Sequence, residues 1–272
     1  MAILTSSNPV LSDSSLGRIF NESGGAVRTN TATVQGVMAK TSLCTMLAVG
    51  AGAVGYTVVA SYPGLAMVAW IAALVVSLVA YFAIWASPKA AMVMTPLYSI
   101  AQGLFLGCLS FALEGILAAQ QIAVPGGLAL QAFLITGSLM AAMLALHTFG
   151  IVRAGPRFTS VLSVMTLGVG IMYLVAFVLS LFGTQVPFLS LGSALQGGTP
   201  ALVGLGINLA ILLLASLWLL VDLAQIDNAV AAGAPKSMEW MLAFGLVVTL
   251  AWVYLEALKL AFRLASMFNS RD

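Results

Sequence analysis

Long apolar runs, interrupted by turn residues and a few charges, form the main pattern of this chain. No residue is charged between Lys40 and Lys89. This stretch is long enough for two membrane crossings of about 20 residues each. Ser61-Tyr62-Pro63-Gly64 interrupts it near the middle, where a turn between two helices is needed. The pattern therefore predicts two membrane-spanning helices in this first part of the chain.

The same pattern continues to the end of the chain and predicts five more helices. Thr95-Pro96 and Thr199-Pro200 each precede an apolar run. Threonine is a favourable N-cap, and proline fits the first helical position. We predict seven spans, at residues 41–62, 65–86, 96–117, 128–150, 158–182, 200–226 and 238–268.

Residues 1–40 differ from the rest because they are rich in Ser, Thr, Asn and Gly and show no helical or strand periodicity. Such a segment cannot bury enough apolar surface to fold alone. It also lacks the pattern of a signal peptide. We therefore predict two regions: a mostly disordered N-terminal tail at 1–40 and a seven-helix membrane domain at 41–272.

Composition supports an all-α integral membrane protein. Apolar residues make up 61% of the 272 residues and charged residues only 7%, whereas soluble proteins carry about 25% charged residues. The net charge of +2 comes from scattered basic residues, which argues against nucleic-acid binding. The lipid bilayer is the predicted environment.

Lysine and arginine in the short loops predict the orientation. The tail and the loops carrying Lys89, Arg153 with Arg157, and Lys236 are positive, while the alternate loops carry no such charge. This alternation predicts a cytoplasmic N-terminus. Three basic residues near the C-terminus, Lys259, Arg263 and Arg271, break the rule. The last segment is therefore either central and shielded by the other helices, or it returns to the cytoplasm.

Four acids fall within the predicted spans, and two of them, Asp222 and Glu256, are the main candidates for function. Asp222 lies near the end of the sixth span, and Glu256 lies deep in the seventh. A carboxylate at the bilayer centre costs at least about 2.5–3.5 kcal/mol on insertion scales, so such residues usually face the bundle interior and serve a function. The alternatives are that Asp222 reaches the interface, or that Glu256 forms a structural ion pair with Lys259. Lys259, Arg263 and Lys89 are the candidate charge partners.

The other polar residues give weaker signals. We expect Glu114 and His147 at the membrane interface, and Asp227 and Glu239 in solvent. A single histidine and two distant cysteines, Cys44 and Cys108, give little material for a metal cluster or a disulfide. No nucleophile–base motif is visible, so we expect neither an enzyme nor a resident cofactor.

Several segments together resemble the Bax inhibitor-1 family of transmembrane Bax-inhibitor-motif proteins, in its bacterial branch. Asp222-Leu-Ala-Gln-Ile226 is similar to the segment that closes the family's sixth helix, and Tyr254-Leu-Glu256-Ala-Leu-Lys-Leu260 to the acidic segment of its last helix. Ala234-Pro-Lys-Ser-Met-Glu-Trp240 and Leu97-Tyr-Ser-Ile-Ala-Gln-Gly-Leu-Phe-Leu-Gly107 fit one bacterial subgroup. Each motif alone is short, but together they cover most of the chain.

The resemblance implies a central last helix surrounded by six others and a pH-sensitive calcium leak in the bacterial cytoplasmic membrane. It assigns control of the pore and pH sensing to Asp222 and Glu256. Since two neighbouring carboxylates in low dielectric resist double ionisation, we expect them to titrate as a unit with a shared proton, and to bind Ca²⁺ weakly and transiently. Glu256 departs from the family's more common aspartate. A proton-coupled transporter or exchanger, and a scaffold that binds proteases or stress-response proteins, are the alternatives.

The predicted helix ends create a difficulty for this pair. Glu256 would lie ~27 Å from the start of its helix, and Asp222 only ~6 Å from the end of its own. They come together only if the first turns of the last helix project from the bilayer or lie along its surface.

Overall fold

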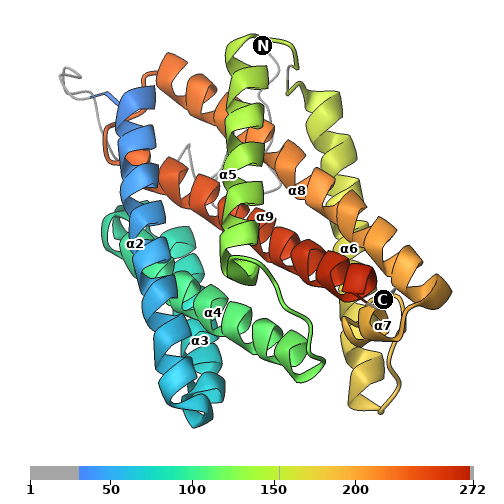
Figure 1. Cartoon of the computed structure of the whole chain (residues 1–272). Helices are drawn as coiled ribbons and strands as arrows, with labels where there is room; N and C mark the ends of the chain where they lie inside the picture. Colours follow the sequence, from blue (N-terminus) through green and yellow to red (C-terminus); the bar gives the residue numbers. More distant parts are fainter. Residues whose placement is uncertain (1–30, 153, 270–272) are drawn as a thin grey trace.

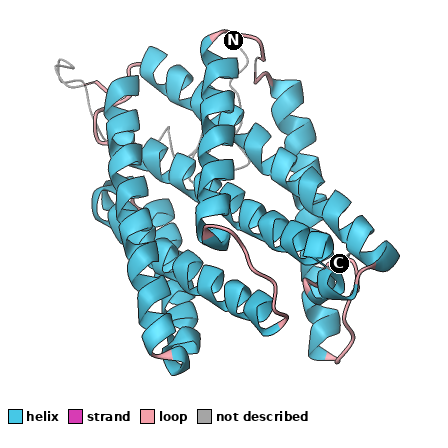
Figure 2. Ribbon diagram, viewed as in Figure 1, coloured by secondary structure: helices cyan, strands magenta, loops and turns pink. Residues whose placement is uncertain are grey.

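The computed structural model describes residues 31–152 and 154–269, which form long helices joined by loops (Figures 1 and 2). The helices are α2 (Val34–Ser61), α3 (Ala66–Ala86), α4 (Ala91–Ala119), α5 (Gly127–Thr148), α6 (Pro156–Leu181), the short α7 (Gly192–Gln196), α8 (Gly198–Ala231) and α9 (Met238–Asn269). Two 3₁₀ turns, Pro63–Leu65 and Pro88–Ala90, precede α3 and α4. Within the described residues, seven helices are long and apolar enough to cross a membrane. The predicted all-α, seven-span fold is confirmed.

The first helix begins earlier than the sequence predicts. The Thr33 side chain caps α2 by accepting a hydrogen bond from the Gly36 backbone N–H at 2.9 Å. The predicted boundary at residue 40 therefore lies inside α2, and residues 34–40 are helical. The apolar pattern missed this turn because it contains Gln35 and Lys40. Residues 1–30 of the predicted tail lie outside the described residues.

The two Thr-Pro pairs mark helix starts only approximately. α4 begins at Ala91, so Pro96 lies inside the helix, and the Thr95 hydroxyl donates to the Trp240 carbonyl in α9 at 3.2 Å. The predicted cap at Thr95 is therefore wrong: this hydroxyl joins two helices. α8 begins at Gly198, which places Pro200 in its first turn, where its missing N–H has no intrahelical partner.

Helix α9 is the central element of the bundle and crosses it obliquely (Figure 1). It packs against α2, α4, α5, α7 and α8, whereas α3 packs mainly against α4 and α6 mainly against α8. In the most apolar stretch of α9, 67% of the residues are buried inside the protein, whereas in that of α6 only 6% are buried. The last helix is therefore central, as the resemblance implies, and α3 and α6 occupy the periphery.

The course of α9 decides between the two alternatives for the basic residues near the C-terminus. α9 is one helix from Met238 to Asn269, long enough at ~48 Å to cross a membrane completely. The Lys259 side chain is only 19% exposed and Arg263 only 3%. The segment is thus central and shielded. Arg271 lies outside the described residues.

The pair α2–α4 is held by direct backbone contact. A Cβ on Gly103 would overlap the Ala48 carbonyl, and one on Gly107 would overlap the Gly52 carbonyl. Small residues allow such close approach, which is how helices commonly associate in lipid. Glycine at these positions is therefore a packing requirement.

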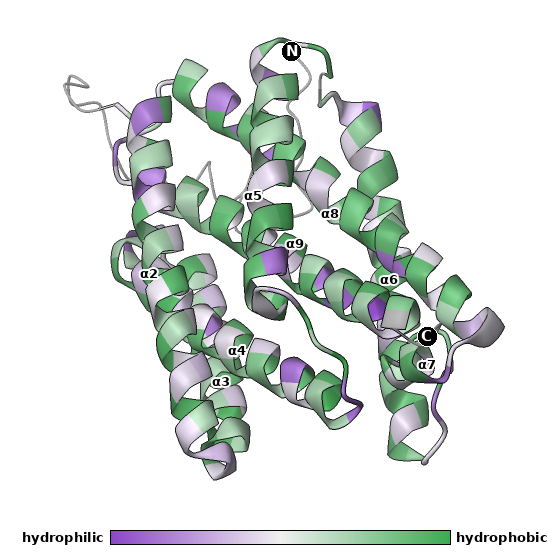
Figure 3. Ribbon diagram, viewed as in Figure 1, coloured by the Kyte–Doolittle hydropathy of each residue, from purple (hydrophilic) through white to green (hydrophobic). Residues whose placement is uncertain are grey.

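Apolar residues cover most of the length of the peripheral helices (Figure 3). Large side chains of α3 and α6, among them Met67, Phe82, Leu167 and Phe177, are not covered by protein. In a soluble protein such surfaces would be an aggregation hazard, but in a bilayer they contact lipid tails.

Candidate functional site

Both intramembrane acids lie on the interface between α8 and α9, which we call the α8–α9 seam. Asp222 in α8 is 3% exposed and accepts a hydrogen bond from the Thr249 hydroxyl of α9 at 2.6 Å. The hydroxyl of Thr249 is also 3.2 Å from the Gly245 carbonyl. A buried carboxylate needs such partners because water cannot solvate it there. Asp222 therefore faces the bundle interior and does not reach the interface.

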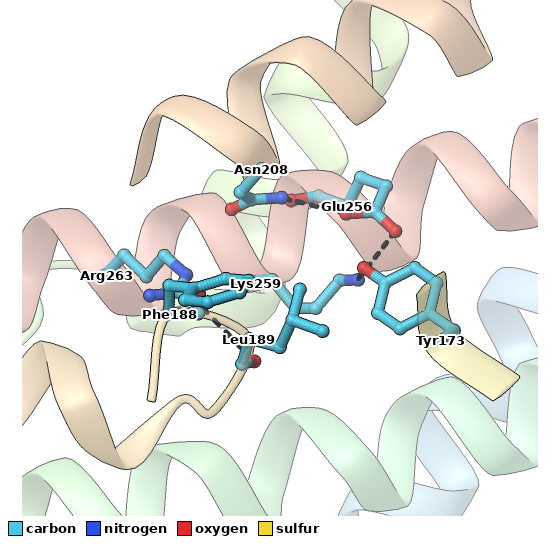
Figure 4. Close-up of polar contacts among 7 residues, drawn as sticks. All are labelled: Tyr173, Phe188, Leu189, Asn208, Glu256, Lys259 and Arg263. Carbon is cyan, nitrogen blue, oxygen red and sulfur yellow. Dashed lines mark hydrogen bonds and ion pairs between the residues drawn. The ribbon is translucent and has the colours of Figure 1, made fainter. Parts of the chain in front are cut away.

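Glu256 in α9 is 1% exposed and has two partners (Figure 4). The Asn208 amide of α8 donates to its Oε2 at 2.8 Å and to its backbone carbonyl at 3.2 Å. The Lys259 ammonium lies 2.6 Å from its Oε1. The predicted ion pair with Lys259 is thus present, and Asn208 fixes the other carboxylate oxygen.

The structure places the two acids on one interface but gives them separate partners. Thr249, which holds Asp222, lies seven residues before Glu256, a rise of ~10 Å along α9. α8 also continues to Ala231, beyond the predicted end at 226, so Asp222 lies nine residues from its helix end. This extension reduces the predicted mismatch in depth. The shared-proton bond between the acids remains a prediction for another conformation.

The three candidate charge partners have different surroundings. Lys259 also donates to the Tyr173 hydroxyl of α6 at 2.9 Å and lies 5.0 Å from the centre of that ring. Arg263 donates to the carbonyls of Phe188, Leu189 and Ser190 at 3.3–3.4 Å, and so holds the loop before α7 against α9. Lys89 lies exposed in the 3₁₀ turn before α4.

Several buried polar atoms of α8 and α9 have no hydrogen-bond partner in the protein. Seven such side-chain atoms occur among the described residues, and five of them belong to α8 and α9: Asn208 Oδ1, both amide atoms of Gln225, and Arg263 Nε and Nη1. Gly204 leaves the space that the Arg263 guanidinium fills, since a Cβ there would overlap it. Unpaired buried groups usually indicate water or an ion, so both are candidates to occupy the interior along α8 and α9.

The sequence missed the residues that position the acids. Asn208 is an amide within an apolar span, a signal of the same kind as an intramembrane acid but weaker. Thr249 and Tyr173 gave no signal, because isolated hydroxyl residues are common in membrane helices. Their roles depend on which helices become neighbours.

The other acids form contacts at the two ends of the bundle. Glu239 is 1% exposed and binds Lys40 and the Thr33 backbone N–H, so the predicted solvated charge is wrong for this residue. Glu114 accepts hydrogen bonds from Tyr56 and from the first N–H groups of α5, where a negative charge is favourable. His147 lies 2.8 Å from Asp227.

No group of three or more His, Cys, Asp or Glu side chains that could hold a metal occurs in the described part of the chain. Asp222 and Glu256 alone offer four carboxylate oxygens, whereas Ca²⁺ takes six to eight oxygen ligands. Any Ca²⁺ held here would need water or carbonyl oxygens as well.

Comparison with known proteins identifies the family. No curated protein and no solved structure gives a significant match to this chain. The family model described as Bax inhibitor 1 like matches residues 8–266. Because this match spans nearly the whole chain, the protein belongs to the Bax inhibitor 1 like family.

Proposed function

We propose that this protein is a pH-sensitive leak pathway for cations, principally Ca²⁺, and that the pathway follows the α8–α9 seam. The observation that supports this most strongly is the position of Asp222 and Glu256: both are buried on one interface of an otherwise apolar bundle. The unpaired atoms of Asn208, Gln225 and Arg263 lie along the same two helices. We propose transport and not catalysis.

The described arrangement corresponds to a non-conducting state in this proposal. Each carboxylate has a partner within the protein: Asp222 binds Thr249, and Glu256 binds Asn208 and Lys259. Conduction requires these contacts to loosen and water to enter. Protons and Ca²⁺ then compete for the same carboxylate oxygens, which makes the flux depend on pH.

The proposed location is the bacterial cytoplasmic membrane, with the N-terminus in the cytoplasm. Lys40, Lys89, Arg157 and Lys236 lie at the helix ends that alternate crossings place on one side, as the positive-inside rule requires of the cytoplasmic face. Proteases or stress-response proteins of the membrane are candidate partners.

Ca²⁺ entry into liposomes that contain the purified protein tests the proposal. The variant Asp222→Asn, Glu256→Gln should lose most of the flux because it removes both carboxylates of the α8–α9 seam. Asp227→Asn is the matched control, since Asp227 is an acid of α8 with a 54% exposed side chain, and it should keep the wild-type flux.

Three outcomes would contradict the leak pathway. Absence of flux in the wild type favours a scaffold that only binds partners. Flux that saturates and is driven by a proton gradient favours an exchanger. Equal flux in the double variant and the wild type excludes the two acids from the pathway.

A further inference from the structure

We propose that Lys259 is a tethered cation that competes with a mobile divalent cation for the Glu256 carboxylate. Glu256 is then a cation-binding site whose occupancy is set by the position of one lysine side chain. The inference rests on the proposed function for the identity of the cation, Ca²⁺. It adds to that function a competing cation, Lys259, and the residue that binds this competitor, Tyr173.

The geometry at Glu256 leaves one carboxylate oxygen for a cation. The Asn208 amide donates both to Oε2 and to the Glu256 backbone carbonyl, so the carboxylate is fixed from the α8 side. Oε1 faces the Lys259 ammonium at 2.6 Å. A charged group with 1% exposure needs a counter-charge. When Lys259 leaves, a proton or another cation must therefore take its place.

Lys259 has a second position within reach. The Tyr173 hydroxyl accepts its hydrogen bond at 2.9 Å, and the Tyr173 ring centre lies 5.0 Å from the ammonium. Figure 4 shows the ammonium between the Glu256 carboxylate and Tyr173. A lysine ammonium on a flexible stem can change partners, and an aromatic face attracts a cation. Tyr173 can thus retain Lys259 while Glu256 is released.

The neighbouring cation on α9 cannot replace Lys259. Arg263 is 3% exposed, and its Nη2 is directed at the carbonyls of residues 188–190. The Asn208 Oδ1 atom is buried and has no protein partner, but it points away from the Glu256 carboxylate, which the amide nitrogen faces (Figure 4). Carboxylate and water oxygens are ligands that Ca²⁺ prefers, so the competitor of Lys259 is a hard divalent cation.

Lys259→Met is the principal test, because methionine keeps an unbranched chain and removes the charge. Binding is measured with Tb³⁺, a luminescent substitute for Ca²⁺ that neighbouring aromatic side chains excite, and transport is measured as Ca²⁺ flux into liposomes. We expect roughly tenfold tighter Tb³⁺ binding, the factor that corresponds to 1.36 kcal/mol. Ca²⁺ flux at low Ca²⁺ should rise as well. Lys236→Met removes an exposed loop lysine and should change neither quantity.

Tyr173→Phe provides a second test that keeps both charges. It removes the alternative hydrogen-bond acceptor, so Lys259 should stay at Glu256, and Tb³⁺ binding and Ca²⁺ flux should both fall. Unchanged Tb³⁺ binding in Lys259→Met, or tighter binding in Tyr173→Phe, would overturn the competition. A wild type without Ca²⁺ flux would overturn the proposed function only, because the Tb³⁺ measurement does not require transport.

Discussion

The α2–α4 and α8–α9 interfaces are built from similarly apolar helices but are packed in opposite ways. Around Gly103 and Gly107, α4 contacts the backbone of α2, which leaves no room for side chains there. The polar pair Tyr56–Glu114 lies only near the end of this interface. At the α8–α9 seam, Asp222, Asn208 and Glu256 occupy the space between the helices. Apolar composition places both pairs in the membrane, and only the residues at the contact decide whether an interface is dry or polar.

The largest expected effect is the loss of the dry interface in Gly107→Val. The new side chain would meet the Gly52 backbone, which cannot move away as a flexible side chain could. Overpacking typically costs 1–3 kcal/mol, occasionally more, so we expect a clear drop in the thermal unfolding temperature of the detergent-purified protein. Gly115→Ala in the same helix meets nothing within 4 Å and should not lower that temperature. Equal stability of the two variants would contradict close backbone packing.

The second effect concerns the pH dependence of Ca²⁺ flux, which we attribute to the acids of the α8–α9 seam. If Asp222 and Glu256 titrate together, Asp222→Asn and Glu256→Gln should each flatten the profile of Ca²⁺ flux against pH. The reason is that each substitution leaves a single carboxylate, which cannot report the protonation of a coupled pair. Gly115→Ala should retain the wild-type profile. Wild-type profiles in both acid variants would show that the sensor lies elsewhere.

The smallest effect is expected for Gln225→Leu, a substitution of similar size in α8. Both amide atoms of Gln225 are buried without a protein partner. If water fills the seam, the leucine variant should keep its stability to within about 1 kcal/mol and lower the Ca²⁺ flux. A large gain in stability with unchanged flux would mean that Gln225 lines no water-filled pathway.

Much of the membrane architecture is predictable from sequence because the bilayer thickness sets the number of apolar residues that each span needs. The predicted second, fourth and fifth spans agree with α3, α5 and α6 to within two residues at each end. Errors arose where Thr95-Pro96 was interpreted as a helix start and where polar residues continue a helix beyond its apolar run. Residues 34–40 of α2 and 227–231 of α8 are such extensions, and the second one changes the depth of Asp222.

The candidate site was predictable only in part. Asp222 and Glu256 were identifiable because ionisable residues are rare and costly within apolar spans. The Lys259 contact also follows from sequence, since residues three apart lie on neighbouring parts of one helix face. Asn208 lies 48 positions before Glu256, and Tyr173 lies 86 positions before Lys259. No local pattern relates residues at such separations.

The sequence by itself determined that this is a seven-helix membrane protein with two intramembrane acids, because hydrophobic length and charge frequency are properties of the chain alone. The tertiary structure decided what those acids contact. The crossing of α8 and α9 brings Asp222 to Thr249 and Glu256 to Asn208, and α6 places Tyr173 beside Lys259. These contacts depend on helix tilt and register, which arise from packing between distant segments. Thr249, the α9 partner of Asp222, lies about two helical turns from Glu256.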